Sequence, residues 1–134
     1  IIRWQGRIGA YAAISRMSAP EGWFCLAPVA VLPEWQGGAL AAGRPGPDGA
    51  FHLGSRIVRE TVETFASRPV RNVTERGLVP TLVVLGDPRF YARCGFSLER
   101  AARLVSPYPV DHTLIARPGE DVPEARLVYP AAFG

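Results

Sequence analysis

The chain has 134 residues, of which 48% are hydrophobic and 20% are charged. This balance excludes a disordered chain, and the length suits one globular domain rather than two. Every basic residue is Arg, which excludes Schiff-base chemistry on a lysine and a P-loop lysine. The net charge of +3 is spread along the chain, so the sequence predicts no nucleic-acid surface.

The first elements in chain order predict a β-hairpin and a buried strand. Residues 1–4 and 7–15 are strand-like and flank a tight turn at Gln5-Gly6. Residues 23–32 form a near-continuous apolar run, which is typical of a strand buried on both faces. Pro28 lies in this run and cannot donate to a sheet ladder, so we expect the strand to be bulged or unpaired on one side near its middle.

A loop and a helix follow. Residues 37–49 are rich in Gly, Ala and Pro and predict an exposed loop. Residues 55–68 predict an amphipathic helix, ended by Pro69, whose apolar positions recur at helical spacing. These positions are Val58, Val62, Phe65 and Ala66. Residues 70–77 are polar and leave a loop and a short helix as alternatives.

The last third of the chain alternates short elements. Residues 81–85 predict a strand, and residues 89–94 predict a short helix that Asp87 caps and Gly95 closes. A strand is expected from Phe96 onward, another at residues 113–116, and an edge segment at residues 127–129. The order β-β-β-α-β-α-β-β predicts an α/β (α+β) fold, a mixed sheet with helices packed on it.

Metal, disulfide and membrane chemistry find no support in the sequence. Cys25 and Cys94 lack metal-ligand spacing, as do His52 and His112, so we expect two reduced thiols and no metal. No apolar run approaches the roughly 20 residues that span a bilayer. No signal peptide precedes the first strand, so we expect a cytoplasmic protein without membrane contact.

Several segments together resemble the GNAT superfamily of N-acetyltransferases, and its YhbS-type branch in particular. In order, these are the strand end VAVLPEWQG at residues 29–37, the helix, and the strand with GDPRFYARCGF up to residue 96. SPYP at residues 106–109 and VYPAAF at residues 128–133 are also similar to that branch. The resemblance implies one GNAT-like domain over residues 1–134, with a mostly antiparallel central sheet. The family's N-terminal strand and helices are then missing from the sequence, and a Gly/Pro-rich insertion lies near residues 38–51.

The resemblance implies acetyl-CoA as co-substrate. The pantetheine arm would then pair with the backbone of Val29, Ala30 and Val31, where the strand diverges from its neighbour; the alternative is that Pro28 only marks a bulge. No metal is implied.

The pyrophosphate would bind backbone N–H groups at a helix start, and two registers are open. Without a gap, residues 36–41 match the family's loop, but a helix begun there meets Gly43 and Pro45. With a gap, Gln36 and Gly37 keep their place, and Leu53, Gly54 and Ser55 start the helix. The gapped register is preferred because it puts a helix dipole behind the phosphates. It places His52 where it crowds the diphosphate or donates to it.

Tyr91 is the predicted catalytic residue. It matches the family tyrosine that protonates the departing thiolate, and a phenol of pKa about 10 suits such a leaving group. The alternative is that Tyr91 and Phe90 simply pack the short helix against the sheet. No general base is evident: Glu21, Glu34, His52 and His112 all read as surface residues.

The predicted function is transfer of acetyl from acetyl-CoA to a primary amine of an unidentified small molecule or peptide. The alternative is a catalytically impaired GNAT-like module that binds CoA or contacts a protein, and an unrelated α/β domain with the same pattern also stays open. A homodimer is left open. The acceptor cannot be read, because the family's acceptor site uses the first helices.

Overall fold

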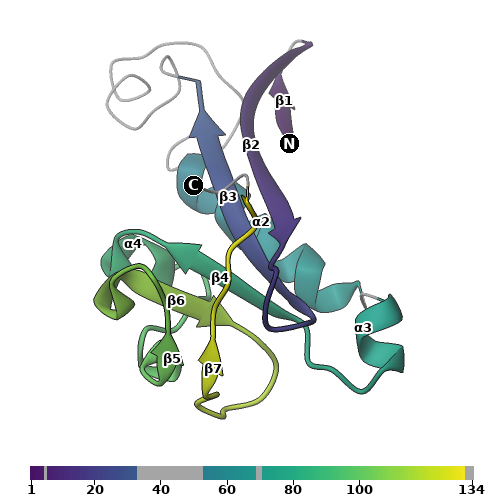
Figure 1. The fold of residues 1–134 in the computed structure, drawn as a ribbon. Helices are drawn as coiled ribbons and strands as arrows, with labels where there is room; N and C mark the ends of the chain where they lie inside the picture. The colour runs from purple at the N-terminus through teal and green to yellow at the C-terminus, as the bar shows by residue number, and fades with distance from the viewer. Residues whose placement is uncertain (5, 33–52, 69–70, 132–134) are drawn as a thin grey trace.

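The computed structural model describes residues 1–4, 6–32, 53–68 and 71–131, and the statements below concern these residues. A twisted sheet runs through the molecule, with helices on its faces and edges (Figure 1). In chain order the elements are β1 (Ile2–Trp4), β2 (Arg7–Arg16), β3 (Trp23–Val31), α2 (Leu53–Ser67), α3 (Arg71–Glu75), β4 (Thr81–Leu85), α4 (Pro88–Ala92), a 3-10 helix (Glu99–Ala101), β5 (Leu104–Val105), a second 3-10 helix (Val110–His112), β6 (Thr113–Ala116) and β7 (Ala125–Arg126).

The central sheet is mixed and mostly antiparallel, as predicted. Its strand order is β1-β2-β3-β4-β6. Only β3 and β4 pair in parallel; the other neighbours in this sheet are antiparallel. β5 and β7 form a separate two-stranded parallel sheet. A parallel pair needs a crossover connection, and α2 and α3 occupy the one between β3 and β4.

The predicted N-terminal hairpin is confirmed. β1 and β2 pair antiparallel around a turn in which Gly6 has φ +77°, a left-handed conformation that glycine adopts without a steric cost. Gln5 lies outside the described residues. β2 then continues to Arg16 and pairs along most of its length with β3.

Strand β3 changes character at its middle. Residues 23–26 are buried, but from Ala27 onward the side chains are partly or fully exposed. Ala12 pairs with Val29 and Ile14 with Leu26, so Ala27 and Pro28 together oppose one residue of β2. The bulge expected at Pro28 is confirmed. The expectation that the whole strand is buried on both faces is wrong, because only its first half lies inside the molecule.

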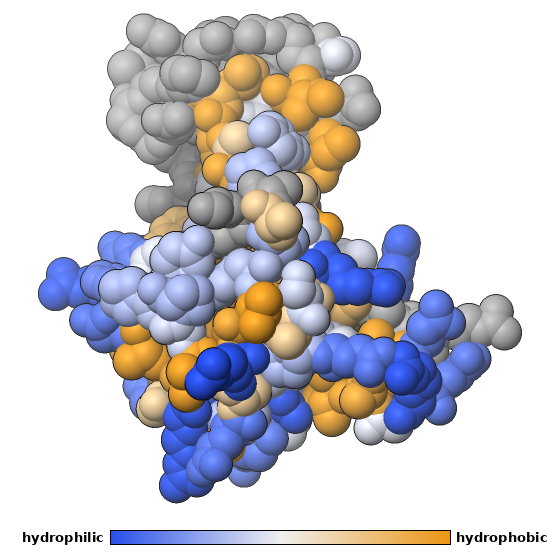
Figure 2. Space-filling view, in the orientation of Figure 1, coloured by the Kyte–Doolittle hydropathy of each residue, from blue (hydrophilic) through white to orange (hydrophobic). Residues whose placement is uncertain are grey.

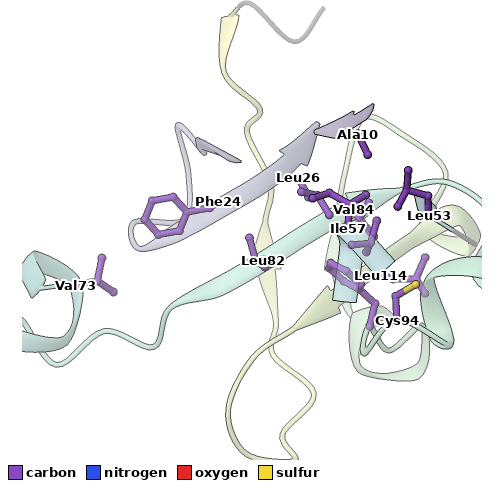
Figure 3. Packing of buried hydrophobic residues seen from close by; sticks show 12 residues of the cluster. Ala10, Phe24, Leu26, Leu53, Ile57, Val73, Leu82, Val84, Cys94 and Leu114 are labelled. Carbon is purple, nitrogen blue, oxygen red and sulfur yellow. The ribbon is translucent and has the colours of Figure 1, made fainter. Parts of the chain in front are cut away.

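Helix α2 covers one face of the sheet. It begins at Leu53, two residues earlier than predicted, and Leu53, Ile57 and Val58 are its buried residues. These side chains meet Leu26, Leu82 and other residues of the facing strands in one apolar cluster (Figure 3). Full burial of an aliphatic side chain of this size stabilises the fold by about 1.5–3 kcal/mol.

A second apolar cluster lies on the opposite face. Its buried members are Met17, Trp23, Cys25, Val83, Ala101, Leu104, Ile115 and Leu127, and Ala125 and Tyr129 pack against it. Residues from the last third of the chain therefore cover the face that α2 does not. The C-terminal segment after β7 runs up across this face in front of β4 (Figure 1). A backbone bridge between Ala19 and Val128 holds it in place.

Two predicted strands are displaced. Beyond Phe96, Ser97 forms only an isolated bridge with Ile115, and a 3-10 helix follows. The Ser97 hydroxyl accepts a hydrogen bond from the backbone N–H of Arg100 at 3.2 Å, a local bond that favours a turn over a strand. The last strand is at Ala125–Arg126 rather than at residues 127–129.

Candidate functional site

The central feature of the site is a split between β3 and β4. The two strands pair only at Trp23 with Thr81, Phe24 with Leu82 and Cys25 with Val83. Past Cys25, within the described chain, β3 pairs with β2 while β4 pairs with β6. Figure 1 shows the two arrowheads pointing apart. Since a strand directs its N–H and C=O groups to both edges, β4 does not pair with the groups on the facing edge of β3 beyond Cys25.

The three predicted backbone contacts lie in the diverging half of β3. Val29 and Val31 pack against the cluster on the α2 face. Ala30 lies between these two residues in β3 and pairs with Tyr11 of β2. Because successive side chains of a strand alternate, the Ala30 side chain points to the other face of the sheet. The expected place of Val29, Ala30 and Val31 beside a strand divergence is therefore what the structure has; their contact with a ligand stays a prediction.

The first turn of α2 reaches the same place. A Cβ atom on Gly54 would lie 3.8 Å from Cγ2 of Val31 and 3.8 Å from Cζ of Phe90. The helix therefore starts between the end of β3 and helix α4. The first N–H groups of a helix have no partner within the helix, and this first turn contains no acidic residue. It suits an anion.

Helix α4 carries Tyr91 and has a defined start and end. The Asp87 carboxylate accepts the backbone N–H of Arg89 at 2.9 Å, which confirms the predicted cap. Gly95 has φ +105°, and the N–H of Phe96 donates to the carbonyl of Tyr91 at 3.2 Å. This is the closing pattern of a Schellman turn. The helix is Pro88–Ala92, slightly earlier than predicted.

The Tyr91 ring is held on several sides. It lies against Gly86, where an added Cβ would be only 2.5 Å from the ring's Cε2 atom. Its centroid is 4.9 Å from that of Phe90 and 5.8 Å from that of Phe96, both in edge-to-face geometry. Burial raises the pKa of the Tyr91 phenol, and Cys94 raises it further. The phenol therefore keeps its proton at neutral pH.

Both cysteines are free and buried, as predicted. The Cys94 thiol lies 3.9 Å from the backbone carbonyl of Ser55, which links α4 to the first turn of α2. Burial raises the pKa of both thiols, so neither is a thiolate nucleophile at neutral pH.

The structure describes some of the predicted site residues and not others. Val31, Gly54, Phe90 and Tyr91 are brought together where β3, α2 and α4 meet. Gln36, Gly37, Glu34, His52 and the insertion near residues 38–51 lie outside the described residues, so the structure does not test their placement.

The candidate bases are placed in part. Glu21 is paired with Arg76, and both side chains are exposed. The His112 ring Nδ1 lies 3.4 Å from the carbonyl oxygen of Gly86, so this exposed histidine reaches the glycine on which Tyr91 rests. Sequence reasoning missed that contact, because no local pattern connects positions so far apart.

Among the described residues, no group of three or more His, Cys, Asp or Glu side chains could hold a metal ion. No helix in the described part of the chain is both long and apolar enough to cross a membrane.

Comparisons with known proteins identify the fold. No protein-family model matches the sequence, and no curated protein matches it. The structure is similar to that of the GNAT family N-acetyltransferase YhbS from Escherichia coli, determined in complex with CoA, with a TM-score of 0.65 and 23% identity over 96% of this chain. The fold is that of the GNAT N-acetyltransferases. A GNAT family acetyltransferase from Brucella melitensis, in complex with acetyl-CoA, has a TM-score of 0.53 and 24% identity over 98% of this chain. The chain spans 64% and 65% of the length of these two proteins.

Proposed function

We propose that this chain carries the co-substrate site of an acetyl-CoA-dependent N-acetyltransferase, which moves an acetyl group to a primary amine. The observation that carries the proposal is the split between β3 and β4, with the start of α2 and Tyr91 at its margin. Two structures of the same fold are complexes with CoA and with acetyl-CoA. The resemblance read from the sequence points to the same chemistry.

The residues present fit the co-substrate. A pantetheine arm carries amide groups, and the diverging half of β3, with the predicted contacts Val29, Ala30 and Val31, is the strand along which it would run. A pyrophosphate needs N–H donors and close approach, and Gly54 and Ser55 supply both at the start of a 15-residue helix. In the gapped register, Gln36 and Gly37 complete the pyrophosphate site.

Tyr91 is assigned the role of general acid. In acetyl transfer the amine nitrogen forms a bond to the acetyl carbon, the carbon–sulfur bond breaks, and the sulfur takes a proton. A phenol of pKa about 10 is protonated at neutral pH, and burial raises the pKa of Tyr91 further. The proton that the amine loses returns to the phenolate through solvent. Acid catalysis of this kind typically contributes about 100- to 10,000-fold in rate.

Direct attack by the amine is favoured over an acyl-enzyme. A covalent intermediate would need an activated nucleophile at the split, and the candidate is Cys25 at its base. That side chain is buried, and burial raises the pKa of its thiol. The amine therefore reacts within a ternary complex.

The second candidate function is CoA binding without turnover. Two observations about the general base favour it. The Glu21 carboxylate forms an ion pair with Arg76 on the surface, and β3 contains no carboxylate. A weakly catalytic module would keep the split and the helix start. Dimer formation and cytoplasmic location stay predictions from the sequence.

Binding of acetyl-CoA is the first test of the proposal. Acetyl-CoA, followed by calorimetry and thermal shift, should bind and raise the melting temperature, since a ligand of the native state stabilises it. Absence of any response at millimolar acetyl-CoA would exclude both candidate functions.

Tyr91→Phe then separates the two candidates. In the transferase it should lower kcat by about 100-fold or more while the Kd of acetyl-CoA stays within about threefold. The matched control is Tyr11→Phe, an exposed tyrosine on β2 that should leave both constants unchanged. An unchanged kcat in Tyr91→Phe would remove the acid role; binding without turnover of any amine tested would favour the second candidate.

A further inference from the structure

A pocket of about 570 Å³ lies on the face of the sheet opposite α2. The described residues that line it are Val105, Ser106, Pro107, Tyr108, Arg126, Leu127, Val128, Tyr129, Pro130 and Ala131, and it is called the tyrosine pocket below. Its size is in the range of small-molecule sites. In the view of Figure 2, pale and orange residues cover the middle of this face, and most strongly hydrophilic residues lie toward its margins.

The pocket is preformed by main-chain bonds. The N–H of Leu127 donates to the carbonyl of Val105 at 2.7 Å, and the N–H of Val128 donates to the carbonyl of Ala19 at 2.9 Å. The backbone N–H of Tyr108 donates to the Ser106 hydroxyl at 3.1 Å. Both walls are therefore fixed without a ligand.

One wall of the pocket packs against the base of the split. Tyr129 packs against the cluster that contains Cys25 and Val83, which are the last paired residues of β3 and β4. Tyr91 belongs to the cluster on the other face. A group in the tyrosine pocket can therefore approach the split from the face opposite Tyr91.

The lining indicates a class of ligand. The rings of Tyr108 and Tyr129 meet edge to face with centroids 5.0 Å apart, and aromatic faces accommodate apolar bodies. Among the described lining residues, the charged one is Arg126, on β7, which lies below the split in Figure 1. It disfavours a second positive charge at the outer end.

We propose that the tyrosine pocket is the acceptor site, and that it takes a primary amine carried on an aromatic or other apolar body without a second positive charge. This inference rests on the proposed transferase function. The amine nitrogen points to the split, where it meets the acetyl carbon, and the apolar body lies between the tyrosine rings and the proline side chains. Polyamines are poor acceptors because their distal ammonium groups meet Arg126.

The test uses 2-phenylethylamine and spermidine as probes and Val105→Trp as a blocking variant. Val105 is 56% exposed and lines the pocket, so the larger ring fills the pocket without disturbing a core. The control is Val79→Trp, the same change at an exposed position that does not line the pocket. Binding of 2-phenylethylamine alone is followed by protein NMR, and turnover by release of the CoA thiol.

The expected result is that 2-phenylethylamine binds wild type and Val79→Trp, and binds Val105→Trp at least about tenfold more weakly, a loss of about 1.4 kcal/mol. The KM for this amine should rise equally while the Kd of acetyl-CoA stays unchanged. Spermidine should have the higher KM, and Arg126→Glu should lower it. Equal amine binding by the two Trp variants would overturn the acceptor site even where acetyl-CoA binds and is turned over. Failure of acetyl-CoA binding with selective amine binding would instead remove the transferase and leave an amine-binding pocket.

Discussion

The ring of Tyr91 rests directly on the main chain of Gly86. No side chain fits between them, since a Cβ atom on Gly86 would lie 2.5 Å from Cε2 and 3.2 Å from Cδ2 of the ring. Gly86 directly follows β4, which ends at Leu85, and its N–H donates to the carbonyl of His112 at 3.0 Å. The position of the phenol is therefore set by a glycine fixed at the end of a central strand.

Gly86→Ala should displace the Tyr91 ring. The added methyl group forces the ring or the backbone to move, at a cost of about 1–3 kcal/mol in the free energy of unfolding. The kcat for acetyl transfer should fall together with stability. Urea denaturation and initial rates check this.

A double variant provides the control for Gly86→Ala. In a Tyr91→Ala background the clash is gone, so Gly86→Ala should cost far less there than in wild type. Equal costs in the two backgrounds would show that the ring is not held by this contact.

Gly54→Ala should separate ligand binding from folding. The new Cβ makes contacts of 3.8 Å, and Ala is the better helix former, so stability should stay equal or rise by up to about 1 kcal/mol. If phosphates approach this turn, the methyl group should weaken acetyl-CoA binding by about tenfold, or 1.4 kcal/mol. Calorimetry with acetyl-CoA measures the second effect and thermal denaturation the first. An unchanged Kd would place the phosphates elsewhere.

Arg100→Ala should destabilise the fold more than any exposed arginine would. The Arg100 guanidinium donates to the carbonyls of Arg117, Pro118 and Asp121 and to the Asp121 carboxylate, at 2.8 to 3.2 Å. Its side chain is only 18% exposed. Loss of these charge-assisted bonds should lower the free energy of unfolding by about 2–3 kcal/mol.

Arg103→Ala is the matched control. Arg103 pairs with Glu124 at 3.4 Å, and both side chains are largely exposed. Such a surface pair contributes less than about 1 kcal/mol. Urea midpoints of the two variants should therefore differ clearly; similar midpoints would show that the Arg100 bonds do not stabilise the loop at residues 117–121.

Tyr129 should make stability fall at high pH. Burial raises the pKa of its phenol to about 12 from 10.0, against the lowering effect of a hydrogen bond with the Ser106 side chain. The unfolded chain therefore releases this proton near pH 10 and the folded chain only near pH 12. The resulting stability is fully present below pH 10 and is lost as the pH rises from 10 to 12, by at most about 3 kcal/mol.

Tyr129→Phe should flatten that part of the profile. Urea midpoints measured at pH 9 and pH 11.5 should differ less in Tyr129→Phe than in wild type. Tyr11→Phe, which removes an exposed hydroxyl, should follow wild type. Identical pH profiles for wild type and Tyr129→Phe would contradict a buried phenol at this position.

Much of the architecture could be predicted because local signals determine it. The strands at residues 81–85 and 113–116 are short apolar runs between turn residues, and both occur where predicted. Helix α2 follows its apolar spacing, and the Asp87 cap follows from its place before Pro88. The bulge at Pro28 follows from the missing donor of proline.

The remaining features depend on contacts between distant residues. β7 consists of two residues that pair with β5, and so short an element has no periodicity to detect. A turn forms at Ser97 where a strand was predicted, and in it the Ser97 hydroxyl accepts a hydrogen bond from the backbone N–H of Arg100. At the site, the order of segments predicted Tyr91 beside the sheet. The contact of His112 with Gly86 and the ring pair of Tyr108 and Tyr129 arise only in the folded chain.

The half of β3 that diverges from β4 has a consequence for solubility. A strand edge that no neighbour pairs can recruit strands from other molecules, and long exposed edges lead to aggregation. Pro28 is exposed at the centre of this stretch and has no N–H to offer. A strand of another molecule can therefore pair with this edge only over a few residues. A narrow ligand needs backbone pairing over only a few residues. The same proline that interrupts the ladder protects the opening from other chains.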